Sequence, residues 1–482
     1  MIIVLKTKHI TEGAILLNII AELNRKITTH MTTCLDKALE ENSGLTGMVE
    51  STLQLVREMG RDILEELIES LEESLLSSDE RKEEWTIHSR NREKKISTLL
   101  GDISYNRTYY RSRKTGAFRH LVDELLDIEP HSRIDTGLKA DMLDKAKEMS
   151  YEQVVKSYDD ISISTRSTVK NLVHSTSMAG SNWPSLKSDK KKVRFLHVEA
   201  DEDHVHQQKG KGMIMKLAYV HEGKSLVNPF SATKNHRYEL IGAQYMTGLY
   251  PKNDDFWFEV LDYLDTQYDL DSVERVFLSG DGAPWIRAGK DILPKCSFVI
   301  DGYHLSKYIK TATASYKGWE KKLKNYVYSG NREMVEAYFD TIEGNDHTEA
   351  ELKRLGSCRT YILGNWDEVQ SRSLNGYVEC SAEGHVSHIL SHRLSSRPIS
   401  WSRKGSENVA KLRVYTRNGG SIRGLLENAK VIQMKDKVQV RVNKTTLKNR
   451  KKSYEEFSSN ITILDIGKRT NAYKFLKSIR SA

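Results

Sequence analysis

Apolar residues recur at every third or fourth position through residues 11–85, which is the spacing of one face of an α-helix. This spacing serves packing against a neighbouring element, and it serves a dimerisation helix equally well. The pattern therefore predicts a helical amino-terminal region and leaves these two roles open. The clearest stretch consists of Leu64, Leu67, Ile68, Leu71, Leu75 and Leu76.

The pattern changes to alternation in residues 94–113, KKISTLLGDISYNRTYYRSR. Gly101-Asp102 in its middle is a typical turn signal, so the segment predicts a β-hairpin. A small hairpin that contacts DNA and a ribbon packed inside the protein both fit its side chains. The residues that line it are Tyr105, Arg107, Tyr109, Tyr110, Arg111 and Arg113.

Two short helical segments follow, SYEQVVKSYDD and STRSTVKNLVHS, and Ser164 or Thr165 is suited to cap the second. This is the length and order of a helix-turn-helix, whose second helix enters the major groove of DNA. Helical pairs of this size also occur in proteins that bind no DNA. In a DNA-binding pair, the contacting residues are predicted to be Arg166, Lys170 and Asn171.

After a linker rich in Ser, Gly and Lys, the pattern becomes that of an α/β protein. Three strands, a helix, a strand, a helix and a strand are expected in that order. This is the order of a ribonuclease H-like core, with three antiparallel strands and parallel additions. The strands are expected at 193–200, 213–221, near 236–241, at 273–279 and at 297–300, with helices at 254–266 and 284–293.

Acidic residues lie at the ends of these strands. Glu199, Asp201 and Asp203 share one face because strand side chains alternate, Asp281 follows the fourth strand, and Asp301 follows the fifth. Gathered carboxylates repel one another unless a cation neutralises them. Oxygen ligands without cysteine suit Mg²⁺ or Mn²⁺, and two such ions catalyse phosphoryl transfer. A single aspartate after a strand is often a turn or cap residue, so it is the set that predicts metal-dependent chemistry.

Composition and charge restrict the class of protein further. Of 482 residues, 38% are hydrophobic and 29% charged, which is typical of a soluble globular chain. No apolar run approaches the roughly 20 residues of a membrane helix, so we expect a cytoplasmic, nucleoid-associated protein without a membrane partner. The four cysteines are widely spaced and predict neither disulfides nor a zinc site. The net charge of +8 is mild, but basic clusters at 187–194, 317–324 and 444–452 suit a polyanion.

Four motifs, in this order, resemble those of DDE transposases of the Mutator superfamily. They resemble more closely the bacterial insertion-sequence transposases once classed as a family of unknown function. The motifs are ADEDHV at 200–205, GDGAPWI at 280–286, DGYHLSKYI at 301–309, and AEGHVSHILSHRLSSRP at 382–398 with WS at 401–402. The resemblance implies that Asp201, Asp281 and Glu383 are the catalytic residues and metal ligands. It also implies an all-helical insertion before Glu383.

Several positions keep two interpretations. Asp203 is the alternative to Asp201, and Glu379 is the alternative to Glu383, while Asp301 and His304 are candidate accessory residues. His304 suits either the orientation of a carboxylate or phosphate, or a structural role.

The basic segment around 385–397 adds its own candidates. Arg393 and Arg397 are predicted to contact phosphate, with solvated surface charge as the alternative. His385, His388 and His392 lie at helical spacing, but no fourth ligand stands out, so no zinc site is predicted. Trp285 and Trp401 are predicted to be core residues rather than base-stacking platforms.

The sequence thus predicts an α/β protein with a ribonuclease H-like catalytic core that carries an all-helical insertion, preceded by a mainly helical DNA-binding region. The expected activity is that of a transposase, which uses two Mg²⁺ or Mn²⁺ ions to cleave the terminal inverted repeats of its element and join them to target DNA. It would act as a homo-oligomer assembled on the DNA ends.

The alternatives are a nuclease of the same fold that does not join ends, and a decayed DNA-binding protein. The expected parts are a helical, oligomerising region at 1–94, a hairpin segment at 95–134, a helix-turn-helix at 135–175, a linker at 176–192, the core at 193–304 and 376–425, the insertion at 305–375 and a basic tail at 426–482.

Overall fold

The computed structural model describes residues 12–40, 44–158, 161–162, 165–178, 189–228, 237–315, 318–344 and 347–429. The chain divides into two compact units, Met1–Arg423 and Gly424–Ala482, and the described sheets all lie in the first. Ser164, most of the expected linker and nearly all of the expected basic tail lie outside the described residues. None of the described helices combines the length and the apolar character that a bilayer crossing requires.

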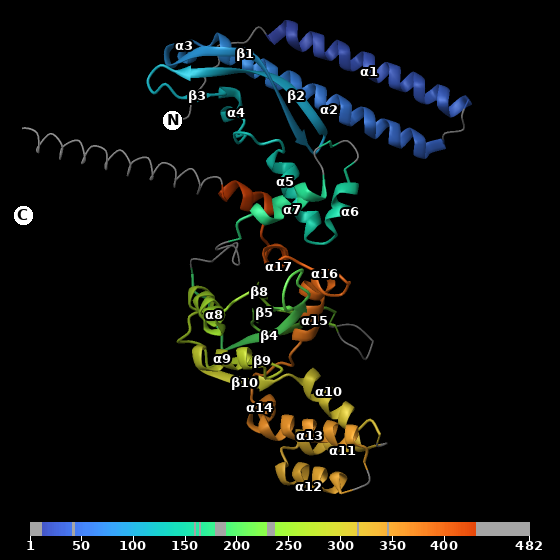
Figure 1. The fold of residues 1–482 in the computed structure, drawn as a ribbon, viewed down its shortest axis with the longest axis vertical. Helices are drawn as coiled ribbons and strands as arrows, with labels where there is room; N and C mark the ends of the chain where they lie inside the picture. The colour runs from blue at the N-terminus through green and yellow to red at the C-terminus, as the bar shows by residue number, and fades with distance from the viewer. Residues whose placement is uncertain are drawn as a thin grey trace, which may run out of the picture. The chain divides into compact units, whose positions relative to one another are not determined.

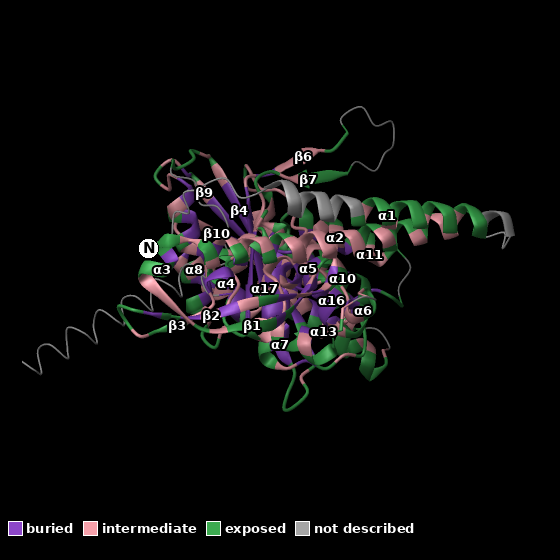
Figure 2. Ribbon diagram, turned by 90° about the horizontal axis from the view of Figure 1, so that it is seen from above, coloured by how far each residue is buried: buried purple, intermediate pink, exposed green. Residues whose placement is uncertain are grey.

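Helices α1 (Glu12–Glu40) and α2 (Gly44–Ser77) form an antiparallel pair (Figure 1). The side chains that join them are polar, while large apolar side chains on both helices stay exposed, as the green stretch of α1 shows in Figure 2. The polar contacts join Lys26 to Asp62, His30 to Thr52 and Cys34 to Ser51. The exposed apolar residues are Ile27, Met31, Leu35, Leu45, Val49, Leu53, Val56 and Leu67.

After α3 (Asp79–Glu84), the predicted hairpin is present as β1 (Trp85–Thr98) and β2 (Gly101–Ser112), with β3 (Phe118–Arg119) beside β2. Its first strand begins at Trp85, within the region predicted to be helical, and its turn was predicted two residues too late. Thr98 pairs with Gly101, so the turn is at Leu99 and Leu100. Gly101 already belongs to β2, and its φ of 113° is one that glycine adopts without strain.

The hairpin packs on α2, and this contact decides the role of several of its side chains. Tyr105 and Tyr110 are buried, and their hydroxyls donate to Asp123 at 2.9 Å and to Glu72 at 3.1 Å. Arg107 forms an ion pair with Asp123. These three residues therefore belong to a packed ribbon. Tyr109, Arg111 and Arg113 are not buried.

Four short helices follow the hairpin: α4 (Leu121–Leu125), α5 (Thr136–Ala146), α6 (Tyr151–Lys156) and α7 (Arg166–Ser175). The predicted helical pair is confirmed as α6 and α7. Thr165 caps α7, because its hydroxyl accepts the Thr168 amide at 3.1 Å. Helix α7 packs against α5, α6 and the late helix α17 (Arg403–Arg417).

The main sheet has the strand order β10-β9-β4-β5-β8. Strands β4, β5 and β8 are antiparallel neighbours, and β9 and β10 are parallel to β4. The third strand was predicted wrongly near 236–241, because β7 (Tyr238–Leu240) pairs with β6 (Lys224–Leu226) in a separate small sheet. The strands are β4 (Phe195–Val205), β5 (Met213–His221), β8 (Gln244–Gly248), β9 (Arg275–Gly280) and β10 (Cys296–Ile300).

Each face of the sheet is covered by different helices. Leu196, Val198 and Ala200 of β4 share a core cluster with residues of α8 (Asn253–Gln267) and α9 (Pro284–Ile292). The intervening residues of β4 point to the other face, which α15 (Ala382–Val386) and η2 (Ser387–Ser391) contact. Figure 2 shows β4 as buried.

The stretch between β10 and residue 373 contains only helices and turns among its described residues, as predicted for 305–375. The late basic segment is also helical, but η2 inserts a π-helical turn between α15 and α16 (His392–Leu394). The helices of the first stretch are α10 (Gly302–Ala312), α11 (Trp319–Tyr328), α12 (Arg332–Glu343), α13 (Glu349–Gly364), α14 (Trp366–Gln370) and the 3-10 turn η1 (Ser371–Ser373).

The fit of α9 against α8 makes the first prediction. A Cβ at Gly289 would lie 2.7 Å from the buried ring of Trp257 and 2.9 Å from Leu278, so Gly289→Ala should lower the free energy of unfolding by about 1–3 kcal/mol. On α13, a Cβ at Gly356 meets no atom within 4 Å. Gly356→Ala should therefore stabilise the chain by up to about 1 kcal/mol. Urea denaturation of both variants checks this, and equal effects would contradict the packing described.

Candidate functional site

Three parallel strands bring acids to the same end of the sheet. Glu199 of β4 lies opposite Ser279 of β9, and Ser279 lies opposite Val299 of β10. Two residues further along the chain come Asp201, which lies within β4, and Asp281 and Asp301, which directly follow the last residues of β9 and β10. Asp201 does not end its strand as expected, since β4 continues to Val205 in its pairing with β5.

Asp201 is the most perturbed of these acids, with 8% of its surface exposed. Burial is the main cause that raises the pKa of Asp201 to about 7, and the charges of Glu383 and Asp281 raise it further. The Glu202 amide, which donates to Asp201 at 2.9 Å, and His304 act in the opposite direction. The pKa of Asp201 is therefore influenced by groups from four parts of the chain, which are β4, the β9–α9 turn, α10 and α15.

The Asp281 turn is held from two sides. Its Oδ1 accepts the Ala283 amide at 2.8 Å, and its backbone oxygen accepts the hydroxyl of Tyr361 at 2.8 Å. Gly282, which follows, has a φ of 97°, a conformation that favours glycine. Tyr361 belongs to α13, so the helical stretch touches the turn that carries Asp281.

Asp301 is engaged by its own helix. It caps α10 by accepting the Tyr303 amide at 3.0 Å and the His304 amide at 3.4 Å, and it accepts Nδ1 of His304 at 2.8 Å. That hydrogen bond is the main cause that raises the pKa of His304, and the charges of Asp301, Asp201 and Asp281 add to it. Asp301 thus favours the protonated form of His304, and the charges of Asp201 and Asp281 act in the same direction.

The two competing glutamates differ in their partners. Glu379 forms two hydrogen bonds with Arg372 Nη2, at 2.6 and 2.8 Å. Glu383 is exposed, and within the described ranges its side chain makes no hydrogen bond or ion pair, although its charge acts on Asp201. The geometry therefore favours Glu383 over Glu379 as a neighbour of Asp201.

Asp203 lies on the same face of β4 as Asp201 but is bound elsewhere. Its Oδ1 accepts the hydroxyls of Ser391 at 3.0 Å and Ser395 at 2.7 Å. Its Oδ2 is buried and has no hydrogen-bond partner among the residues that the structure describes. Asp203 therefore links β4 to the segment after Glu383, and it is not among the charges that act on Asp201.

Glu199 has a role that the sequence did not indicate. It is 1% exposed and accepts the Ser381 amide at 2.6 Å, Nε2 of His221 at 2.9 Å and the hydroxyl of Tyr219. Burial opposes its ionisation, but these partners outweigh burial and lower the pKa of Glu199 to about 2. Ser381 precedes α15, so this buried carboxylate fixes the start of the helix that carries Glu383.

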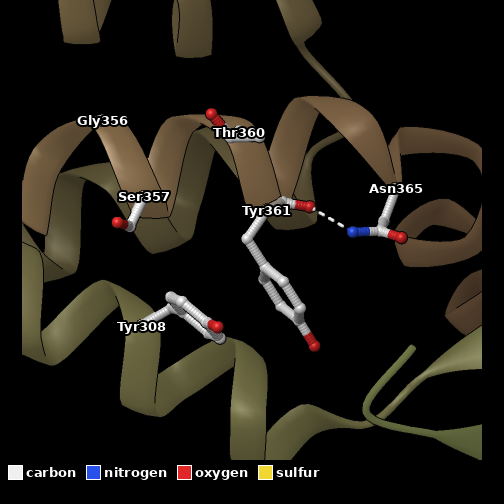
Figure 3. Close-up of a pocket in the computed structure, with 6 residues that line it drawn as sticks. All are labelled: Tyr308, Gly356, Ser357, Thr360, Tyr361 and Asn365. Atoms are coloured by element: carbon white, nitrogen blue, oxygen red, sulfur yellow. Dashed lines mark hydrogen bonds between the residues drawn. The ribbon is translucent and has the colours of Figure 1, made fainter. Parts of the chain in front are cut away.

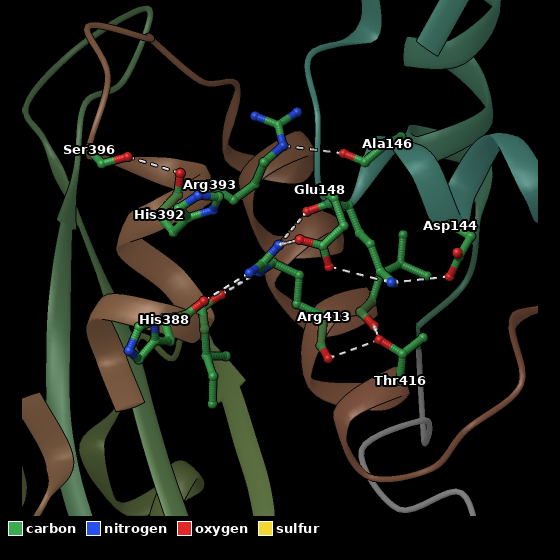
Figure 4. Close-up of polar contacts among 12 residues, drawn as sticks. Asp144, Ala146, Glu148, His388, His392, Arg393, Ser396, Arg413 and Thr416 are labelled. Carbon is green, nitrogen blue, oxygen red and sulfur yellow. Dashed lines mark hydrogen bonds and ion pairs between the residues drawn. The ribbon is translucent and has the colours of Figure 1, made fainter. Parts of the chain in front are cut away.

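Arg393 was predicted to contact phosphate, and the structure corrects this. It is 6% exposed, and its Nε donates to the backbone oxygen of Ala146 at 3.3 Å (Figure 4). Its guanidinium lies over the ring of Trp401 at 4.6 Å. Burial lowers the pKa of Arg393 to about 10. The π-helical turn just before it changes which way the following residues point. Arg397 is exposed.

Arg413 ties the same segment to the end of α5. It donates to the backbone oxygens of His388 at 2.9 Å, Ile389 at 2.5 Å and Lys147 at 2.8 Å, and it pairs with Glu148 (Figure 4). Backbone oxygens in an irregular helical turn need such partners. Arg413 thus joins the segment after Glu383 to the helices before the sheet.

The remaining candidates fall into two groups. Trp285 and Trp401 are buried, which confirms them as core residues. His385 packs against Tyr219 and Tyr245, and burial lowers the pKa of His385 to about 4, while His388 and His392 are exposed.

The residues expected to contact DNA in the helical pair lie on the surface. Val169 and Val173 of α7 are fully buried, whereas Arg166, Lys170 and Asn171 are exposed. The side chains are therefore accessible to a partner.

The carboxylates offer the hard oxygen ligands that Mg²⁺ and Mn²⁺ prefer. Within the part of the chain that the structure describes, no group of three His, Cys, Asp or Glu is arranged to hold a metal ion. Burial is the main cause of the raised pKa of Asp201, and the charges of Glu383 and Asp281 add to it. The oxygen chemistry of these three side chains suits a divalent cation, and Glu383 is the exposed one of the three candidates.

The chain belongs to the uncharacterised protein family UPF0236, whose model matches residues 38–430. A UPF0236 protein of Caldanaerobacter subterraneus subsp. tengcongensis, whose name joins eleven gene loci, is 34% identical, covering 98% of this chain and 99% of the relative. A UPF0236 protein in the vanSb 3′ region of Streptococcus gallolyticus is 26% identical, covering 80% of this chain and 85% of the relative. A solved structure of the simian T-cell lymphotropic virus intasome in complex with PP2A regulatory subunit B56 gamma also matches, with 11% sequence identity. The match covers 55% of this chain and 78% of that chain. Its TM-score of 0.14 is too low to support any conclusion.

The buried histidine beside this site gives a pH prediction. Burial lowers the pKa of His197 to about 4, and its ring stacks on His221 at 4.9 Å and Phe277 at 5.3 Å. His197 binds a proton near pH 6.5 in the unfolded chain but only near pH 4 in the folded chain. This contribution to stability is therefore complete above pH 6.5 and is lost as pH falls to 4. Across that pH range, the free energy of unfolding of the wild type should fall by about 3 kcal/mol relative to that of His197→Phe.

Denaturation series at several pH values measure this difference. His204→Phe, an exposed position of the same strand, is the control and should keep the wild-type pH dependence. A constant stability difference between His197→Phe and the wild type would contradict the burial argument.

Proposed function

We propose that this protein is a DNA transposase of the DDE type, with Asp201, Asp281 and Glu383 as its metal ligands and catalytic residues. The observation that carries the proposal is the buried position of Asp201, whose pKa is raised chiefly by burial and further by the charges of Glu383 and Asp281 from separate parts of the chain. Titratable groups perturbed by burial and by charged neighbours mark functional sites. The order of three antiparallel strands followed by parallel strands supports a ribonuclease H-like core.

The relatives add independent support. One relative's name joins eleven loci of one genome. A mobile element multiplies its own gene within a genome, so a single protein encoded at many loci is the pattern that transposition produces.

The chain's own groups suggest how the reaction would proceed. Asp201, Asp281 and Glu383 would hold a pair of divalent cations, which when bound supply activation of the attacking hydroxyl and stabilisation of the leaving oxygen. His304, whose pKa is raised chiefly by its bond to Asp301, would present positive charge to the scissile phosphate. Glu199 would keep Glu383 in place through the Ser381 amide. No covalent link between protein and DNA is needed.

The proposed partners are the terminal inverted repeats of the element and target DNA. Arg166, Lys170 and Asn171 on the exposed side of α7 would contact the repeats. The exposed apolar residues of α1 and α2 are suited to association of two copies on the DNA ends, because the contacts between these helices are themselves polar.

The decisive test is cleavage of a labelled duplex that carries the element's end, in Mg²⁺ or Mn²⁺. Asp201→Asn, Asp281→Asn and Glu383→Gln should each lower the cleavage rate by at least about 10²–10³-fold, with end binding unchanged. Glu379→Gln is the matched control and should cleave like the wild type, since Glu379 is paired with Arg372.

Two outcomes would replace the proposal. Cleavage without strand-transfer product would identify a nuclease, and end binding without cleavage by any form would identify a decayed DNA-binding protein. Full activity of Asp281→Asn would refute the assignment of the site.

The helix-turn-helix makes a separate prediction about binding. Arg166→Ala/Lys170→Ala should weaken binding to the end duplex and reduce the slope of log affinity against log salt by about one for each phosphate contact removed. Arg25→Ala/Lys82→Ala removes the same charge from α1 and α3 and should leave the slope unchanged. Equal slopes for both double variants, measured by fluorescence anisotropy, would rule out α7 as the DNA-contacting helix.

A further inference from the structure

A groove of about 500 Å³ lies between α10 and α13 (Figure 3). Two tyrosines and small or polar residues line it. A Cβ at Gly356 would meet no atom within 4 Å, so the groove is open at that point. The lining residues are Tyr308, Gly356, Ser357, Thr360, Tyr361 and Asn365.

The two tyrosines form a stacked platform. Their ring centroids are 4.1 Å apart and their planes differ by 15°. Tyr361 is held by its hydrogen bond to the Asp281 backbone, whereas the Tyr308 side chain is 37% exposed. Because Tyr361 is held in place and Tyr308 is accessible, a further flat ring can stack on Tyr308 at low entropic cost.

The platform adjoins the acid site through both of its residues. Tyr308 lies four residues after His304 on α10, which is one helical turn, and His304 acts on Asp201. Tyr361 bonds the turn that carries Asp281. A strand whose phosphate lies at the acids therefore has its neighbouring nucleotide within reach of the groove.

Charge and polarity around the groove suit a nucleotide. Lys307 and Lys310 of α10 and Arg354 of α13 are exposed on the two helices that form the groove, and they carry the positive charge that a sugar-phosphate backbone requires. Ser357 and Thr360 place exposed hydroxyls on the wall of the groove. These hydroxyls both donate and accept hydrogen bonds, as the edge of a base demands.

We propose that this groove binds one unstacked nucleobase of the DNA strand next to the scissile phosphate, with the base lying on Tyr308. The proposal rests on the proposed function, because it takes the acid site to be where DNA is cut. The energy of removing the base from the duplex is then recovered in part by stacking.

The test uses the full-length protein and a single-stranded oligonucleotide that contains 2-aminopurine, whose fluorescence is quenched by stacking. EDTA is present, so no cleavage is needed for the readout. Wild type should quench the probe on binding. Tyr308→Ala should lose the quenching and weaken binding by about 5- to 150-fold, whereas Tyr308→Phe, which keeps the ring, should retain both.

A second pair of variants separates loss of the groove from loss of the fold. Gly356→Leu places a side chain in the open groove, and Gly364→Leu makes the same change elsewhere on α13, where a Cβ also meets nothing within 4 Å. Gly356→Leu should abolish quenching and Gly364→Leu should preserve it. Absence of quenching by wild type, or wild-type quenching by Tyr308→Ala and Gly356→Leu, would overturn the proposal. Quenching with these differences, but no metal-dependent cleavage, would instead refute the proposed function and leave the base site standing.

Discussion

The parallel register of β4, β9 and β10 is the constraint on which the site depends. It places Asp201 beside the ends of β9 and β10, which Asp281 and Asp301 directly follow. Side chains alternate along β4, so a register slip of one residue would turn Asp201 toward the apolar core that faces α8 and α9. Burial and the neighbouring charges then raise the pKa of Asp201, so that a cation at this position would relieve repulsion that the fold itself creates.

Contacts between distant segments hold the rest of the site against these strands. Glu199 binds the Ser381 amide 182 residues away and so fixes the start of the helix that carries Glu383. Arg413 joins the π-helical turn to the end of α5, and Tyr361 joins α13 to the Asp281 turn. Each contact pairs polar groups from segments that lie far apart in the sequence, so the candidate site and the helices that flank it are stabilised together.

Much of this arrangement could be predicted, because alternation and helical spacing are local properties of the sequence. They gave the strands that precede Asp281 and Asp301, the helical pair with Thr165 as cap, and the buried Trp285 and Trp401. The third strand was missed because two short segments had similar patterns and only pairing with β5 distinguishes them. Arg393 was misplaced because a π-helical turn changes its direction, and the role of Glu199 depends on contacts that no local pattern contains.

The central claim is that Asp201, Asp281 and Glu383 converge on divalent cations. Diffraction from crystals grown with Mn²⁺, recorded for its anomalous signal, tests this most directly. We expect two peaks about 3.5–4 Å apart, ligated by these three carboxylates, with Glu383 turned inward. Anomalous peaks elsewhere, or none while the three carboxylates stay apart at saturating Mn²⁺, would contradict the claim.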